Sequence, residues 1–197
     1  SITKEFKKKI FQIDESIHKI KKKFLFSKRN NRILFIGNLN YLPNLLACKD
    51  FIKNILPRLI REIPDVKFSI IGNISNFNKI LLSKKRSVEI LGPQKDISRY
   101  VKNSFCGLAN LKIATGVQGK VLSYMSFGLP AICSKKVAKN FGLNVVSYNE
   151  DAELLKHLLT LKNNKTKGNK LSKNSIKFLK NLKWNKVKIK YLKLLKF

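Results

Sequence analysis

The chain is 197 residues long and carries 42 Lys and Arg against 11 Asp and Glu, for a formal net charge of +31. This length predicts one domain with appendages, and 44% apolar residues suffice for a sizeable core, which excludes a wholly disordered chain. The apolar runs are far shorter than the roughly 18 residues of a membrane-spanning helix, and three dispersed cysteines suggest neither a disulfide framework nor a zinc site. We therefore expect a cytoplasmic protein without a metal or cofactor.

The positive charge is mostly Lys and is concentrated at the two ends of the sequence, with no acidic residue after Glu153. Clustered Lys favours anionic partners such as nucleic acid or a membrane surface. The same excess also fits a compositional drift toward Lys, Asn and Ile, and we favour this second interpretation. We do not expect a nucleic-acid partner, because the sequence has no recognisable nucleic-acid-binding motif.

The first 32 residues open with SITKEFKKKIFQI, which predicts a short basic helix. The stretch that follows has no clear tertiary partner. We expect the natural fold to start upstream of this sequence.

From residue 33 onward, six short apolar runs each stop at a turn residue and predict β-strands. The runs are ILFIG at 33–37, KFSIIG at 67–72, VEILG at 88–92, CGLANL at 106–111, PAICS at 130–134 and NVVSY at 144–148. Most lack an alternation of apolar and polar residues, as expected for parallel strands that are covered on both faces.

Helical patterns lie between these strands, at 44–63, 97–102, 119–127 and 151–161. Pro57 falls inside the first of them and should kink the helix or restart it. The alternation predicts an α/β fold with a Rossmann-like, doubly wound parallel sheet, whose ligands bind at the carboxyl ends of the strands.

The segment NNKTKGNK at 163–170 predicts a solvated linker. Apolar residues then recur at three- to five-residue steps and predict a basic amphipathic C-terminal helix with a break near Trp184. Its apolar stripe could dock on the α/β domain or adsorb to a membrane. We favour docking.

The run TGVQGKVLSYMSFGLPAICS at 115–134 is the most informative part of the sequence. Gly116 and Gly119 follow a strand, and Lys120 falls in the first turn of a helix, where free N–H groups and the helix dipole favour an anion. The pattern is neither a Walker loop nor GxGxxG. A phosphate cradle and an ordinary loop whose glycines only permit the turn both stay open.

A second polar turn, Gly37-Asn38-Leu39-Asn40, follows the first predicted strand. Glycine at that place allows a ligand to approach the backbone closely, and the Asn amides can hydrogen-bond it. Two polar turns at one sheet edge favour a ligand site more than either turn alone.

In order, RILFIGNLNYLPN, IPDVKFSIIGN and GVQGKVLSYMSFGLP resemble the carboxyl-terminal half of GT-B glycosyltransferases of the group 1 (family 4) type, over about residues 33–160. Trp184 resembles the tryptophan that many such enzymes carry where the chain crosses back toward the other domain. Residues 1–16 resemble the end of the amino-terminal domain. The resemblance implies that 1–32 are a remnant of that domain and a linker, 33–162 the nucleotide-sugar-binding domain, and 163–197 the basic linker and C-terminal helix.

The resemblance also implies that a sugar donor places its diphosphate at the loop 116–120, where Lys120 neutralises the leaving nucleoside diphosphate and Lys112 assists. Two positions that are commonly glutamate in the family are Thr115 and Ser123 here. This difference bears on how tightly the donor binds and on which donor it is. The implied substrate-binding residues are Gly37, Asn38, Lys112, Thr115, Gly116, Gln118, Gly119, Lys120 and Ser123. We assign no catalytic residue.

The leading hypothesis is a transferase that moves a hexose from a nucleotide-diphosphate sugar to a glycan or lipid-linked glycan, in cell-envelope polysaccharide synthesis. Such an enzyme would be cytoplasmic, with peripheral contact to the anionic inner face of the membrane. A catalytically inactive nucleotide-binding remnant is the alternative, and a basic nucleic-acid-binding module is a third, less favoured one.

Overall fold

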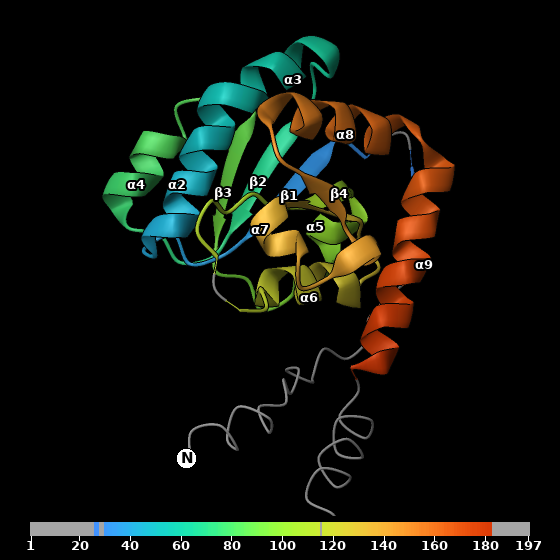
Figure 1. The fold of residues 1–197 in the computed structure, drawn as a ribbon. Helices are drawn as coiled ribbons and strands as arrows, with labels where there is room; N and C mark the ends of the chain where they lie inside the picture. The colour runs from blue at the N-terminus through green and yellow to red at the C-terminus, as the bar shows by residue number, and fades with distance from the viewer. Residues whose placement is uncertain (1–25, 28–29, 115, 183–197) are drawn as a thin grey trace, which may run out of the picture.

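The six apolar runs form the six strands of one parallel sheet in the computed structural model, which describes residues 26–27, 30–114 and 116–182 (Figure 1). The sheet order is β3-β2-β1-β4-β5-β6, and each neighbouring pair is parallel. The strands are β1 (Arg32–Ile36), β2 (Lys67–Ile71), β3 (Val88–Gly92), β4 (Ser104–Ala109), β5 (Ala131–Ser134) and β6 (Val146–Tyr148). The predicted Rossmann-like, doubly wound α/β fold is confirmed.

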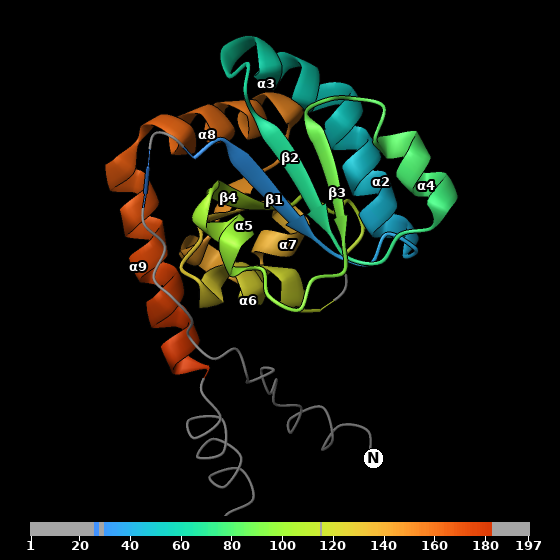
Figure 2. The ribbon, with the colours of Figure 1, turned by 180° about the vertical axis from the view of Figure 1, so that it is seen from behind.

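Helices cover the sheet, with α2 and α4 on one side of the molecule, α9 on the opposite side, and α3 and α8 along the top (Figures 1 and 2). The helices are α2 (Leu42–Asp50), η1 (Phe51–Ile55), α3 (Leu56–Glu62), α4 (Asn76–Leu82), α5 (Ser98–Lys102), α6 (Gly119–Ser126), α7 (Lys135–Ala138), η2 (Gly142–Asn144), α8 (Asp151–Asn163) and α9 (Lys165–Asn181). Among the described residues, no helix combines the length and apolar character needed to cross a bilayer.

Pro57 divides the first helical segment as the sequence predicts. The π-turn η1 precedes it, and α3 starts afresh with Pro57 in its first turn. Proline has no N–H to donate within a helix, and its ring collides with the preceding turn, so a wider turn before it relieves both problems.

Helix α4 has no counterpart among the predicted helices. Its N-cap is Ser75, whose hydroxyl accepts a hydrogen bond from the Asn78 N–H at 3.3 Å. A serine immediately before a helical segment is a recognised start signal, so the sequence did carry evidence for this helix.

The prediction of a linker at 163–170 is wrong, because α9 begins at Lys165. The side chain of Asn164 caps the helix by accepting a hydrogen bond from the Lys167 N–H at 2.8 Å. Gly168 is buried, and a Cβ there would lie 3.3 Å from the Phe26 ring. Capping and close packing therefore outweigh the weak helix propensity of Asn and Gly.

Helix α9 docks on the α/β domain by packing against α6. It buries Leu171, Ser172, Ser175 and Leu179, which confirms the predicted docking for the described part of the C-terminal segment. Trp184 and the helix predicted near the start of the chain lie outside the described residues.

The sheet opens between β1 and β4, and Tyr124 of α6 spans the opening. The register of this pair runs from Arg32↔Ser104 to Leu34↔Gly107. Beyond it, the Ile36 N–H donates to the Tyr124 hydroxyl at 2.9 Å, and that hydroxyl donates to the Leu108 carbonyl at 3.1 Å. The Tyr124 side chain therefore satisfies backbone groups that the separating strands no longer pair with each other.

Gly107 makes room for that ring, since a Cβ at this position would lie 2.4 Å from the Tyr124 ring. Tyr124 is fully buried, and its burial raises the pKa of the hydroxyl well above the ordinary value. The hydroxyl therefore stays protonated and able to donate.

Replacing Tyr124 by Phe should lower the free energy of unfolding by about 1–3 kcal/mol, because it leaves the part-buried N–H of Ile36 and the buried carbonyl of Leu108 without this partner. Urea denaturation measures the change. Tyr41→Phe is the control, since Tyr41 is 55% exposed and should change stability little. Equal stability of the Tyr124→Phe variant and the wild type would contradict the bridging role.

Candidate functional site

The strand order reverses between β1 and β4, and open α/β sheets bind their ligands at such a switch point, in a crevice at the carboxyl edge that we name the β1–β4 crevice. The connections from β1 and β4 leave toward opposite faces, so their loops diverge and leave space between them. In Figure 2 the arrowheads of β1, β2 and β3 converge toward this edge. Both polar turns singled out in the sequence follow these two strands.

The loop after β1 places Gly37 and Asn38 at the crevice. The Gly37 N–H donates to the Ile71 carbonyl at 2.9 Å, which extends the β1–β2 pairing by one bond. Asn38 is exposed, and its side-chain oxygen accepts from the Asn40 N–H at 3.0 Å. This local bond fixes the turn, so the Asn38 oxygen has a structural task in addition to the predicted one.

The loop after β4 leads into α6. Gly116 has a φ of +63°, in the left-handed region that favours glycine, and its carbonyl accepts from the Asn140 side chain at 2.9 Å. Gln118 is the N-cap residue of α6 and has an extended backbone conformation, and Gly119 is the first helical residue. N–H groups in the first turn of a helix have no intrahelical acceptor, so this end suits an anion. Thr115 lies outside the described residues.

Lys120 reaches from the first turn of α6 toward the β1 side of the crevice. Its Nζ donates to Asn44 Oδ1 at 2.5 Å and lies 4.1 Å from the centre of the Phe35 ring. Burial lowers the pKa of Lys120 from 10.5 to about 8. The side chain is thus a partly desolvated cation at the place where the sequence predicts one.

Lys112 is held in a different way. Its Nζ forms a salt bridge with Asp50 at 2.6 Å, and its side chain is 80% exposed. The hydrogen bond and charge of Asp50 raise the pKa of Lys112. The structure therefore ties Lys112 to the end of α2, whereas it brings Lys120 to the loop after β1. Ser123 lies one turn into α6 and is half-buried.

Two residues that the sequence analysis did not propose contribute to the site. Asn44 links Lys120 to the β1 loop, and the hydroxyl of Tyr124 bridges the ends of β1 and β4. Asn44 directly follows Pro43 in the first turn of α2, a place that gave no sign of a contact across the sheet. Tyr124 lies within the helix predicted at 119–127, whose pattern gave no sign of a bond to the sheet.

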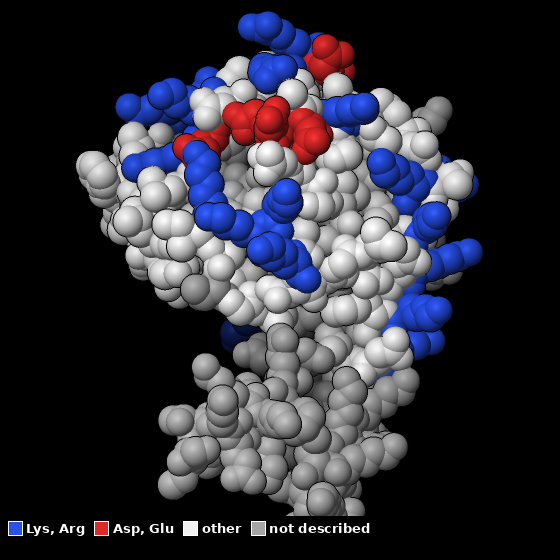
Figure 3. All heavy atoms as spheres, in the orientation of Figure 1, with Lys and Arg blue, Asp and Glu red and all other residues white. Residues whose placement is uncertain are grey.

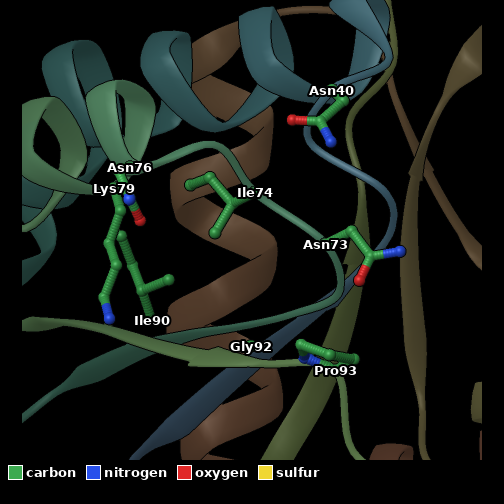
Figure 4. A pocket seen from close by; sticks show the side chains of 8 residues that line it. All are labelled: Asn40, Asn73, Ile74, Asn76, Lys79, Ile90, Gly92 and Pro93. Carbon is green, nitrogen blue, oxygen red and sulfur yellow. The ribbon is translucent and has the colours of Figure 1, made fainter.

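A separate pocket of about 440 Å³ opens at the same carboxyl edge, beside the ends of β2 and β3 (Figure 4). Polar side chains and a few apolar ones line it, and they come from loops, from helix α4 and from strand β3 (Figure 4). The lining residues are Asn40, Asn73, Ile74, Asn76, Lys79, Ile90, Gly92 and Pro93. None of them belongs to α6, and Asn40 belongs to the loop after β1.

Cys48, Cys106 and Cys133 are free and buried. Burial raises the pKa of each thiol. Among the residues with described structure, no cluster of His, Cys, Asp and Glu could hold a metal ion.

The family described as "Glycosyl transferases group 1" matches residues 30–164 of the chain. A Klebsiella pneumoniae protein named "Uncharacterized 44.6 kDa protein in cps region" is 25% identical over 166 residues, which cover 78% of this chain and 43% of that protein.

Solved structures share the fold. TarM superposes with a TM-score of 0.72 at 17% identity, covering 93% of this chain and 38% of TarM. HepE of Anabaena, solved in complex with UDP and glucose, gives a TM-score of 0.65 at 14% identity, covering 85% of this chain and 48% of HepE. The chain thus spans less than half the length of each relative that it matches here.

Lys120→Met should change how stability depends on pH. Below pH 8 Lys120 is protonated in both the folded and the unfolded chain, so the folded protein bears the full cost of burying the charge. Between pH 8 and 10.5 only the unfolded chain keeps the proton, so the wild type gains stability relative to the variant as pH rises, by up to about 3 kcal/mol. Urea denaturation of both proteins at pH 7, 8, 9 and 10 measures this difference. A difference that stays constant with pH would contradict the buried charge.

Proposed function

Because the chain belongs to the group 1 glycosyl transferases, we propose that it supplies the nucleotide-sugar-binding half of a GT-B glycosyltransferase and holds the donor diphosphate in the β1–β4 crevice. The observation that carries this proposal is the Lys120 ammonium group at the start of α6, beside the loop after β1. A helix N-terminus and a partly buried cation together favour a diphosphate over a neutral ligand.

The arrangement fits the main demand of sugar transfer. When the bond between the sugar C1 and the diphosphate oxygen breaks, the nucleoside diphosphate leaves with additional negative charge. Lys120 and the first N–H groups of α6 would stabilise that charge. We propose a substrate-binding role for Gly37, Asn38, Lys112, Thr115, Gly116, Gln118, Gly119, Lys120 and Ser123.

The donor and acceptor are inferred from related proteins. The HepE structure contains UDP and glucose, and that of the pneumococcal O-GlcNAc transferase GtfA contains UDP and GlcNAc. WaaG is described as a glycosyltransferase involved in lipopolysaccharide biosynthesis, and the Klebsiella protein comes from a cps region. We infer a UDP-hexose donor and a glycan or lipid-linked glycan acceptor in cell-envelope polysaccharide synthesis.

Calorimetric titration with UDP, GDP and their hexose conjugates tests the donor site. Lys120→Ala should weaken nucleoside-diphosphate binding at pH 7 by tenfold or more, because it removes a charge-assisted contact worth about 1.5–3 kcal/mol. Lys173→Ala on the exposed face of α9 is the control and should bind like the wild type. Unchanged binding by the Lys120→Ala variant would contradict the proposed cradle.

We also propose peripheral contact with an anionic membrane. Helix α9 exposes Lys165, Lys170, Lys173, Lys177 and Lys180. Blue side chains follow the outer edge of the molecule at the position of α9 (Figure 3). Near an anionic surface each well-placed Lys contributes about 1 kcal/mol.

Sedimentation with vesicles tests this contact. The protein should bind vesicles that contain anionic phospholipid and leave purely zwitterionic vesicles unbound. Lys173→Glu combined with Lys177→Glu should weaken the binding by tenfold or more. Equal binding to both kinds of vesicle would contradict the proposed membrane contact.

A further inference from the structure

Asn44 is a buried polar residue, only 8% exposed, in the first turn of α2. Its Nδ2 donates to the Asn38 carbonyl at 2.9 Å, and its Oδ1 accepts from Lys120 Nζ at 2.5 Å. One amide group therefore joins the loop after β1 to the helix after β4, across the crevice.

We propose that Asn44 is a positioning residue, which holds the Lys120 ammonium group at the crevice so that it meets the donor diphosphate. The proposal rests on the proposed function, because it presumes that a diphosphate binds at Lys120. It adds a residue of α2 to a site otherwise built from two loops and α6.

The amide is suited to this task because it offers a donor and an acceptor on one planar group. The donor side faces a carbonyl and the acceptor side faces an ammonium group, so the two partners fix the orientation of the amide. Leucine has a similar size and could make neither bond. Aspartate could accept from Lys120 but could not donate to the Asn38 carbonyl.

Gly37 shows how closely the amide is seated. A Cβ at Gly37 would lie 2.9 Å from Asn44 Nδ2 and 3.2 Å from the Phe35 ring. The glycine of the first polar turn therefore leaves room for Asn44 as well as for a ligand. The Phe35 ring completes the surroundings of the ammonium group, 4.1 Å from Lys120 Nζ.

The other titratable groups that act on Lys120 are the thiols of Cys48 on α2 and Cys133 on β5. Burial raises the pKa of both thiols, so they are uncharged at neutral pH. The positive charge of Lys120 is thus stabilised by the dipole of Asn44 and the face of Phe35. An ammonium group has three N–H donors, and Asn44 occupies one, which leaves others to meet diphosphate oxygens.

Two measurements on the full chain test this proposal. The first follows the pKa of Lys120 by NMR of its ¹³Cε–¹H signal in lysine-labelled protein, assigned with the Lys120→Met variant. Asn44→Leu should lower the Lys120 pKa below its wild-type value, because the charged form loses its acceptor. Asn44→Asp should raise that pKa above 10, because a carboxylate then faces the ammonium group.

The second measurement is the affinity for UDP at pH 7 and pH 9.5, by calorimetry. Wild-type affinity should fall about tenfold between these pH values, as Lys120 loses its proton above pH 8. Asn44→Leu should weaken binding about tenfold at pH 7. Asn44→Asp should abolish the pH dependence. Asn30→Leu is the matched control, since Asn30 is also a buried amide, 7% exposed, that donates to a backbone carbonyl but lies before β1.

The outcomes separate this inference from the proposed function. Suppose that UDP binds and that Lys120→Ala weakens this binding, while Asn44→Leu changes neither the Lys120 pKa nor the affinity for UDP. The positioning role of Asn44 is then overturned and the donor site stands. If the folded wild type binds neither UDP nor GDP, the donor site and the positioning role both fail, even where the NMR shows that Asn44 shifts the Lys120 pKa. If the Asn44→Leu variant does not fold, the Asn44→Asp variant provides the test. A UDP affinity that falls with pH in the Asn44→Asp variant as it does in the wild type overturns the positioning role of Asn44.

Discussion

The site depends on how the backbone N–H and carbonyl groups find hydrogen-bond partners where β1 and β4 separate. Strands that part inside a protein leave N–H and carbonyl groups without partners, and each buried unpaired group costs about 1–3 kcal/mol. The hydroxyl of Tyr124 serves both strands, with the Ile36 N–H on one side and the Leu108 carbonyl on the other. A crevice can therefore open next to the centre of the sheet while its walls remain hydrogen-bonded.

The same tyrosine determines where Lys120 lies. Residues four apart share a face of an α-helix, so Tyr124 and Lys120 project from the same side of α6. With Tyr124 anchored between the strands, Lys120 is held one turn closer to the carboxyl edge of the sheet. Asn44 and Phe35 then receive the ammonium group from the β1 side.

Much of this could be predicted from the sequence, because the relevant signals are local. Short apolar runs predict all six strands, three of them ending at a glycine, and the glycines before Lys120 predict the start of α6. The linker prediction failed because the packing of Gly168 against Phe26 joins residues more than 100 positions apart. The contact between Asn44 and Lys120 was missed for the same reason, since it spans 76 positions and no local pattern encodes it.

The fit between Gly107 and Tyr124 has an evolutionary consequence. A methyl group at 107 would enter the space of the Tyr124 ring, and a smaller residue at 124 would leave a cavity above Gly107. Each substitution alone costs stability, whereas a larger residue at 107 together with a smaller one at 124 restores the volume, though not the hydrogen bonds of the hydroxyl. Homologous chains should therefore show correlated changes at these two positions, and homologues that lose the tyrosine should carry another hydrogen-bonding group between β1 and β4.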